Sequence, residues 1–274
     1  MINKKSSDSR LQEQLVRSYL HDSFLLNSVD LHVCETLGST NVYVMSRSDT
    51  VGAIYLACVA NHQTEGRGRN GKQWQSPAGS NIYLSIGCSF TGQNLSSLSG
   101  LSLACGVSIA SVLNRLGVRL QLKWPNDILV SGKKLAGILI ETRIKGSSVF
   151  VVVGLGLNVD MSDVEAQDID QPWADLKSSM PIENGSVDNN WLVSQLIIAI
   201  VSACNTFQQT GIQPFIEDWL KYDILIGKEA WVCAGEREVL ARVIGINEDC
   251  SLKVEMEESQ EDVYAADVKI KLKT

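Results

Sequence analysis

A glycine-rich loop, TEGRGRNGKQW at residues 64–74, brings three cations close together: Arg67, Arg69 and Lys72. Its glycines leave backbone N–H groups accessible, and guanidinium groups bind carboxylates and phosphates through paired hydrogen bonds. The loop therefore predicts a site for an anionic ligand, and a solvated basic loop without a ligand is the alternative interpretation. Trp74, at its end, belongs either to the core or to a pocket wall.

The same loop has the glycine spacing of a dinucleotide-binding turn, Gly66-x-Gly68-x-x-Gly71. Such a turn leads into a helix whose amino end binds the pyrophosphate, and an acidic residue about 20 positions later binds the ribose. Here a proline and a glycine in KQWQSPAGS interrupt any helix, and SIGCSFTGQNL at 85–95 has no acidic residue. Both features disfavour NAD as the ligand.

Two further segments place polar residues beside apolar runs. In LKWPNDILV (122–130), Lys123, Asn126 and Asp127 surround a proline between two expected strands. Pro-Asn-Asp turns are common, and most of them are structural. In VVVGLGLNV (151–159), an apolar strand ends in two glycines and an asparagine, Asn158, a pattern that suits the close approach of a ligand.

Two adjacent lysines enter a strand in SGKKLAGILIE (131–141). Successive side chains of a strand point to opposite faces, so only one of Lys133 and Lys134 can share the face of Ala136 and Ile138. Taken on spacing alone, the pair is typical of a solvent-exposed hairpin.

The segments that must position these residues alternate between strand-like and helical patterns. Alternating apolar residues predict strands, and those at 82–90 predict a strand with one face in the core. Apolar residues three and four apart predict helices. Strands are expected at 30–36, 53–61, 82–90, 119–124, 127–143 as a hairpin turning at Ser131-Gly132, and 148–158. Helices are expected at 11–26, for about two turns after the cap Ser39, and at 95–116, 189–208 and 212–221.

The composition limits the class of protein. With 274 residues, 45% of them hydrophobic and 20% charged, the chain is globular, and one large domain or one domain with a small appendage is expected. The net charge of −7 gives no general attraction to phosphate backbones, so we expect no nucleic-acid partner. The seven cysteines form no C-x-x-C pair, which indicates neither a disulfide framework nor a zinc site. No apolar run follows the amino-terminal lysines and none approaches about 18 residues, so a cytoplasmic protein without a membrane partner is expected.

The pattern changes after residue 223. Short β-rich runs at 230–233, 239–246, 251–256 and 263–272 are separated by polar turns, which predicts a small SH3-like barrel. We therefore expect an amino-terminal helical segment at 1–29, a central domain at 30–223 and a carboxyl-terminal domain at 224–274.

Five elements together resemble the bacterial biotin protein ligases: STN at 39–41, QTEGRGRNGKQW at 63–74, KWPND at 123–127, KLAGILIE at 134–141 and GLGLN at 154–158. The match extends from about residue 30 to the carboxyl terminus, and GRGRNG with KWPND is specific as a combination. The resemblance implies an α+β fold, in which a mixed central sheet flanked by helices precedes the SH3-like barrel. Some family members carry an amino-terminal DNA-binding domain, and the roughly 38 residues before STN predict the short form without repressor activity.

The resemblance also implies the reaction. Members of the family join biotin to ATP, giving biotinyl-5′-adenylate and pyrophosphate, and then transfer biotin to one lysine of a carrier protein. The implied cofactors are ATP and Mg²⁺. The implied partner is the biotin carboxyl carrier protein of acetyl-CoA carboxylase or a related carboxylase, and either a monomer or a homodimer is expected.

Site residues follow from the resemblance by position. The implied catalytic residues are Arg67, Arg69 and Lys134. Biotin would be bound by Ser39, Thr40, Asn41, Gln63, Gly66, Arg67, Gly68, Arg69, Trp74, Lys134 and Gly137. The nucleotide would be bound by Arg69, Lys72, Asn126, Asp127, Asn158 and Trp173, with Asp127 also near the magnesium. The segment 160–173 corresponds to a loop that orders around the adenylate, and Lys271 replaces an arginine that often faces the phosphate.

Two other functions compete with this interpretation. A lipoate or octanoyl ligase or transferase shares the catalytic fold but lacks the paired GRGRNG and KWPND elements. A biotin-sensing regulator without catalysis would need a DNA-binding domain, which the sequence does not predict.

Overall fold

The computed structural model describes residues 10–273, apart from 22, 24, 26, 50–53, 80, 93–97, 163–168, 170, 183–185, 235–236, 257–258 and 266–267. The first residue of the strand expected at 53–61, the first turn of the helix expected at 95–116 and half of the segment 160–173 thus lie outside the described residues.

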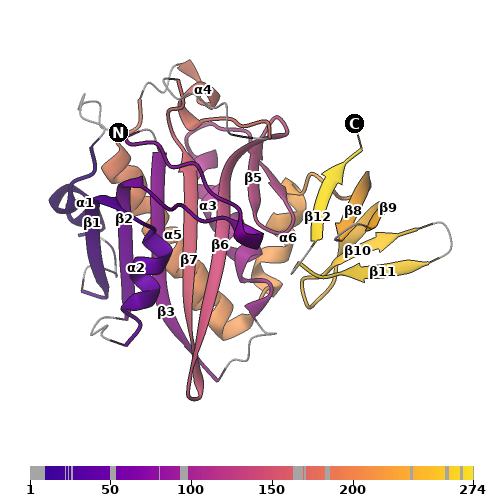
Figure 1. Ribbon diagram of the computed structural model, residues 1–274, viewed down its shortest axis with the longest axis horizontal. Coiled ribbons are helices and arrows are strands. Elements are labelled where there is room, and N and C mark those ends of the chain that lie inside the picture. The colour runs from indigo at the N-terminus through magenta and orange to yellow at the C-terminus, as the bar shows by residue number, and fades with distance from the viewer. Residues whose placement is uncertain are drawn as a thin grey trace.

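A mixed seven-stranded sheet forms the centre of the molecule, in the order β1-β2-β3-β7-β6-β5-β4 (Figure 1). β1 and β2 are parallel, and every other neighbouring pair is antiparallel. The strands are β1 Val29–Leu37, β2 Tyr55–Gln63, β3 Asn81–Thr91, β4 Gln121–Lys123, β5 Asp127–Val130, β6 Lys133–Lys145 and β7 Ser148–Asn158. The mixed sheet expected from the sequence is confirmed.

Helices cover the two faces of this sheet unequally (Figure 1). The long helices lie on one face, where their apolar residues join those of the sheet in the main core. On the other face, the short helix α2 packs Val44 against Leu56, Cys58, Phe150 and Val152 in a second, smaller core. The helices are α1 Glu13–Leu20, α2 Thr40–Ser46, α3 Leu101–Asn114, α4 Leu176–Ser179, α5 Asn189–Thr210 and α6 Gln213–Tyr222.

Strand β3 differs from its prediction, because both of its faces are buried from Asn81 to Cys88. Its large apolar residues enter the main core, whereas Ser85 and Gly87 lie beneath α2. A Cβ atom on Gly87 would be 2.5 Å from a methyl group of Val44. The small residues in the alternating pattern therefore mark the close approach of a helix and not exposure to solvent.

Helix α5 is long and apolar enough to cross a membrane by length and composition alone. In the structure most of its apolar residues are buried in the main core, including Leu196, Ile200 and Phe207. The helix has apolar residues on several sides because α1, α3 and the sheet pack against it. Burial inside the protein accounts for the composition of this helix.

The hairpin of β5 and β6 turns at Ser131-Gly132, as predicted, and both residues have positive φ, 50° and 75°. The pairing register then shifts, because Ala136 lies opposite Ile128 whereas Lys134 lies opposite Leu129. Such a bulge changes the face to which a side chain points. Lys134 consequently lies beside Gly137, whose Cβ position is 3.2 Å from its Cε atom, although simple alternation would place the two on opposite faces.

The carboxyl-terminal region forms a five-stranded antiparallel sheet in the order β11-β10-β9-β8-β12. Its strands are β8 Glu229–Ala234, β9 Arg237–Ile246, β10 Leu252–Glu255, β11 Gln260–Val263 and β12 Val268–Leu272. The run 263–272, expected to be one strand, is divided, because β11 and β12 occupy opposite edges of the sheet. This sheet fits the expected carboxyl-terminal domain, although no pairing among the described residues closes it into a barrel. The boundary near 223 stays a prediction.

The small sheet contacts the large one through side chains near the KWPND turn. The buried indole of Trp124 donates a hydrogen bond to the carbonyl of Cys250 at 3.0 Å. Ser99 Oγ, just before α3, donates to the carbonyl of Asp249 at 2.8 Å. These contacts bring β12, an edge strand, next to the polar residues described below.

Candidate active site

Two adjoining cavities contain nearly all of the predicted site residues. The small cavity, of about 50 Å³, is lined by Ser39, Thr40, Asn41, Gln63, Arg67 and Gly137 among others. The large cavity, of about 230 Å³, is lined by Arg69, Lys72, Asp127, Asn158 and Trp173 among others. Both cavities are lined by Trp74, Asn126 and Lys134, so these three side chains stand where the cavities meet.

The glycine-rich loop folds back on itself and leads into β3 without a helix. The N–H of Gly68 donates to the carbonyl of Lys72 at 2.7 Å, and the N–H of Trp74 donates to the carbonyl of Gly66 at 2.9 Å. Its tip is one 3₁₀ turn, Arg69–Gly71. Gly66 and Gly68 line neither cavity, and a Cβ atom on Gly66 would be 2.4 Å from the carbonyl oxygen of Trp74. These two glycines shape the loop, and the missing helix agrees with the exclusion of a dinucleotide turn.

Glycines on β6 and β7 form the floor of the small cavity. Gly137 pairs with Gly156 across the two strands, and the indole of Trp74 lies on them. A Cβ atom on Gly156 would be 2.5 Å from Trp74, and one on Gly154 would be 2.1 Å from Asn41 Oδ1. The indole N–H of Trp74 is buried and has no hydrogen-bond partner among the described groups.

Buried polar side chains of the small cavity are joined by hydrogen bonds. Ser39 occupies the N-cap position of α2, as predicted, but its side chain makes no capping bond. Gln63 Oε1 accepts from the N–H of Thr40 at 2.8 Å, and Gln63 Nε2 donates to Ser76 Oγ at 3.1 Å. Ser85 Oγ lies 2.7 Å from Thr40 Oγ1. Since buried polar groups without partners are costly, this network fixes the wall of the cavity before any ligand arrives.

An ion pair lines the large cavity where it meets the small one. Lys134 Nζ is 2.7 Å from Asp127 Oδ1 and 5.3 Å from the ring centroid of Trp74. The backbone of Lys134 is held on both sides, since its N–H donates to the carbonyl of Pro172 and its carbonyl accepts from Ala174. The ammonium group of Lys134 therefore has a defined position between the two cavities.

Two asparagines support this arrangement. Asn126 Oδ1 accepts from Arg69 at 3.2 Å, and its Nδ2 donates to the carbonyl of Ile138 at 2.8 Å. Asn158 Nδ2 donates to the carbonyl of Ala174 at 3.1 Å. Arg69 also donates to the carbonyl of Ala265, which ties the glycine-rich loop to the carboxyl-terminal region.

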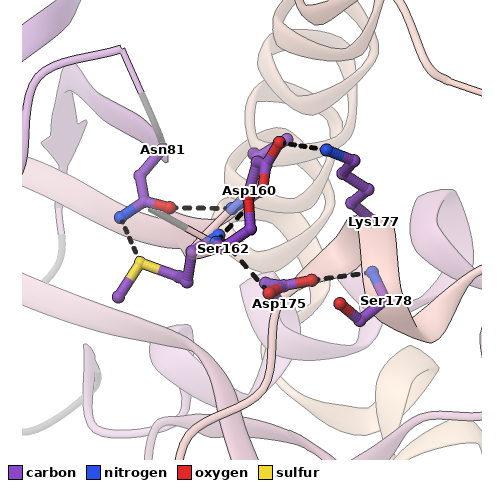
Figure 2. A network of polar contacts seen from close by, with 8 residues as sticks. Asn81, Asp160, Ser162, Asp175, Lys177 and Ser178 are labelled. Atoms are coloured by element: carbon purple, nitrogen blue, oxygen red, sulfur yellow. Dashed lines mark hydrogen bonds and ion pairs between the residues drawn. The ribbon is translucent and has the colours of Figure 1, made fainter. Parts of the chain in front are cut away.

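The segments that follow β7 and precede α4 are joined by a network of polar contacts (Figure 2). The buried carboxylate of Asp175 accepts from the N–H of Ser178 at 2.7 Å and of Met161 at 3.3 Å. Lys177 Nζ is 2.6 Å from Asp160 Oδ2. The network anchors the chain two residues after Trp173, the predicted adenine contact, which lines the large cavity.

Three charged residues near the cavities were not among the predicted site residues. Lys123 and Lys269 line the large cavity, and Glu141 binds Arg67 beside the small one. Burial lowers the pKa of Lys123, which the neighbouring carboxylate of Asp127 partly offsets. Lys123 belongs to KWPND and Glu141 to KLAGILIE, so the motifs contain both, whereas nothing in the sequence marks Lys269.

Lys271, the residue that replaces the family's arginine, lies away from both cavities. Its ammonium group is 2.6 Å from Glu238 Oε1 in the small sheet, and this contact raises the pKa of Lys271. Lys269, two residues earlier on β12, lines the large cavity instead. The lysine contributed by the carboxyl-terminal sheet is thus a different one from that suggested by the resemblance.

Asp127 is the predicted magnesium contact. Its Oδ1 atom is paired with Lys134, and no group of three or more His, Cys, Asp or Glu side chains placed to hold a metal occurs among the described residues. In nucleotide sites Mg²⁺ is commonly held by one or two carboxylates together with the phosphates. Asp127 therefore suits a metal that arrives with a nucleotide, and not a metal held by protein ligands alone.

Comparisons with known proteins show the family of this chain. The biotin/lipoate A/B protein ligase family matches residues 23–158. The bifunctional ligase/repressor BirA of Salmonella typhimurium is 35% identical over 236 residues, which cover 85% of this chain and 71% of BirA. The biotin–[acetyl-CoA-carboxylase] ligase of Mycobacterium tuberculosis is 36% identical over 172 residues, 61% of each chain.

Among solved structures, the biotin protein ligase from Aquifex aeolicus in complex with biotin and ATP has the same fold. Its TM-score is 0.74 at 22% sequence identity, and the match covers 89% of this chain and 99% of the Aquifex chain. With its sequence relatives and its fold in agreement, this chain belongs to the biotin protein ligases of the biotin/lipoate A/B protein ligase family.

Proposed function

We propose that this protein activates biotin as biotinyl-5′-adenylate, with release of pyrophosphate, and then transfers biotin to a lysine of a biotin carboxyl carrier protein. The meeting of the two cavities at Trp74, Asn126 and Lys134 is the observation that carries this proposal. The small cavity offers hydrogen-bonding groups for a compact neutral ring system. The large cavity offers cations for a triphosphate, so the reacting groups would meet beside Lys134.

In the first step a carboxylate oxygen of biotin attacks the α-phosphorus of ATP. A new P–O bond forms, the bond between the α-phosphorus and the bridging oxygen breaks, and pyrophosphate leaves. Two anions must approach each other, so fixed positive charge is required at the point of contact. We assign Lys134 to the carboxylate and the α-phosphate, and Arg67 to the biotin carboxylate. Arg69, Lys72 and Lys123 would bind the remaining phosphates.

When a nucleotide binds, Mg²⁺ would neutralise phosphate charge, and Asp127, which lines the large cavity, would be the carboxylate that holds it. The same carboxylate holds Lys134 at 2.7 Å in the structure. We assign Asp127 to keeping the ammonium group of Lys134 in place.

In the second step the neutral amine of the carrier lysine attacks the acyl carbon of the mixed anhydride. An amide bond forms, AMP leaves with the electrons of the broken C–O bond, and the amine releases a proton. No nucleophilic side chain of the enzyme is needed, so this step depends chiefly on positioning. The name of the Mycobacterium relative supports the carrier of acetyl-CoA carboxylase as the partner.

We further propose that the protein is a cytoplasmic ligase without repressor activity. The net charge of −7 supports the absence of repressor activity, because operator binding is driven largely by cations. A sequence-specific shift of biotin-operon DNA at physiological salt would contradict it.

Isotope exchange between pyrophosphate and ATP tests the first step and separates biotin from lipoate. We expect exchange that depends on biotin and is absent with lipoate, followed by transfer of labelled biotin to a purified carrier domain. Exchange with lipoate instead of biotin would identify a lipoate ligase. Exchange without any transfer to a carrier would contradict the second step.

A further inference from the structure

Glu141 joins the glycine-rich loop to helix α2. It lies on β6 in regular register with β7, on the same face as Gly137, which lines the small cavity. Its Oε1 atom is 3.0 Å from a guanidinium nitrogen of Arg67, and its Oε2 atom accepts a hydrogen bond from Asn41 Nδ2 at 2.8 Å. One carboxylate thus fixes a residue of the loop and a residue of the cavity wall.

The contact with Glu141 determines how the amide of Asn41 is oriented. A carboxylate only accepts hydrogen bonds, so the amide must present its NH₂ group to Glu141 and its oxygen to the opposite side. There the oxygen meets Ser85 Oγ at 2.5 Å. An amide oxygen cannot donate, so the hydroxyl proton of Ser85 must lie between these two atoms.

This order continues to Thr40. Ser85 Oγ is 2.7 Å from Thr40 Oγ1, and Thr40 Oγ1 donates its single proton to the amide oxygen of Gln63 at 3.1 Å. Thr40 Oγ1 then has no proton left for the cavity and offers only lone pairs there. The amide oxygen of Gln63 also accepts from the backbone N–H of Thr40 at 2.8 Å.

We infer that Glu141 is a positioning residue that fixes the amide of Asn41 and, through Ser85, the place of Thr40, which presents an acceptor to an N–H donor of the ligand, and that Glu141 also holds Arg67 at the same cavity. The inference rests on the proposed function, in which the ureido group of biotin supplies the N–H and its carboxylate meets Arg67. A neutral ring with N–H donors at one end and an anion at the other is the ligand that this arrangement favours.

Glu141→Gln tests this positioning role, because a glutamine amide presents its own NH₂ group to either Asn41 or Arg67. We expect the Kd for biotin, measured by calorimetry, to rise about tenfold. The Kd for ATP should change less than twofold. Glu141→Asp keeps the charge and should recover most of the affinity. An unchanged Kd for biotin in the glutamine variant, or an aspartate variant as weak as the glutamine one, would overturn the inference.

A double-mutant cycle with Ser85→Ala tests whether Glu141 acts on Thr40 through Asn41 and Ser85 or has only a general structural role. If Glu141 acts on Thr40 through Ser85, the double variant should bind biotin no more than about threefold more weakly than Ser85→Ala alone, the remainder reflecting Arg67. If the losses of biotin affinity in the two single variants multiply in the double variant, Glu141 does not act through Ser85. The control is Glu217→Gln, which removes an exposed helix ion pair with Lys221 and should change neither measurement.

A measurement without ligand keeps this inference separate from the proposed function. Trypsin cleaves after arginine, so releasing Arg67 from Glu141 should speed cleavage between Arg67 and Gly68 about threefold in Glu141→Gln, but not in Glu217→Gln. Equal cleavage rates would contradict the hold on Arg67 even if biotin binds. If the wild-type protein fails to bind biotin, the proposed function is wrong, while the cleavage rates still decide whether Glu141 restrains the loop.

Discussion

The two cavities are constructed in different ways. The small cavity is lined chiefly by β2, β6, β7 and helix α2, and its buried polar groups hydrogen-bond to one another and to Ser85 of β3. The large cavity collects charges from segments far apart in the chain: Arg69 and Lys72 from the loop, Lys123 and Asp127 from the KWPND turn, and Lys269 from β12. The first is shaped by directional hydrogen bonds, and the second by charge.

The difference indicates what each cavity can distinguish. Directional hydrogen bonds between buried groups discriminate strongly against a ligand with the wrong donors or acceptors, because the mismatch leaves polar groups unpaired. The exposed lysines Lys72 and Lys269 attract any polyanion of suitable size, and salt weakens that attraction. We therefore expect strict selection of the acid and looser selection of the nucleotide.

Lys134 stands between the two cavities, so its removal should have the largest effect. Lys134→Ala should slow biotin-dependent pyrophosphate release about 10²- to 10³-fold, because the approaching carboxylate and phosphate lose fixed positive charge. The circular dichroism spectrum should not change. Lys133→Ala is the matched control, since that neighbouring side chain is exposed. Near-normal pyrophosphate release by Lys134→Ala would contradict the proposal that the substrates meet beside Lys134.

Gly154→Ala should damage the small cavity selectively. The new Cβ atom would lie 2.1 Å from Asn41 Oδ1, so the amide must move away from both Ser85 and Glu141. Overpacking of this kind costs about 1–3 kcal/mol, and we expect biotin affinity to fall at least about tenfold.

Gly245→Ala is its control, because a Cβ atom there meets nothing within 4 Å. Calorimetry with biotin and with ATP provides the comparison for both variants. An equal loss of ATP affinity in Gly154→Ala would show that the two cavities are not separate in function.

Two lysines of β12 test which part of this strand contacts the nucleotide in the large cavity. Lys269→Ala should raise the KM for ATP about three- to fivefold, and Lys271→Ala should change it less than twofold, since Lys271 is paired with Glu238 away from the cavity. The effect of Lys269 should shrink as salt rises. If Lys271→Ala has the larger effect, the phosphates lie closer to the small sheet than we propose.

The smallest expected effect concerns stability. Burial lowers the pKa of Lys123, so between that lowered pKa and the ordinary lysine value the unfolded chain binds the proton more tightly. Folding stability should therefore rise with pH across this interval. At neutral pH the buried positive charge of Lys123 lowers the stability of the folded protein. Lys123→Met should stabilise the protein by up to about 1 kcal/mol at pH 7 in urea unfolding and flatten the alkaline dependence.

Lys133→Met, at an exposed position, should leave both quantities unchanged. A less stable Lys123→Met variant would mean that attraction to Asp127 outweighs the burial of Lys123.

Secondary structure was predicted well where it depends on local patterns. Strand β7 has the predicted bounds, and the hairpin turns at Ser131-Gly132 as expected. Errors occurred where distant segments decide. The run 263–272 was predicted as one strand, but its two parts pair with different neighbours, β10 and β8. Likewise, the second buried face of β3 exists because α2 packs on it.

The sequence by itself determined the fold class, the family and most of the residues around both cavities, because motif residues and apolar periodicity are properties of the chain. Only the tertiary structure decided that a bulge turns Lys134 toward Gly137, that Lys269 and not Lys271 reaches the large cavity, and that Glu141 holds both Arg67 and Asn41. The physical reason is that register shifts and side-chain pairings depend on strands and loops distant in sequence, and no local pattern specifies which of two lysines on the same face of β12 lies beside the large cavity.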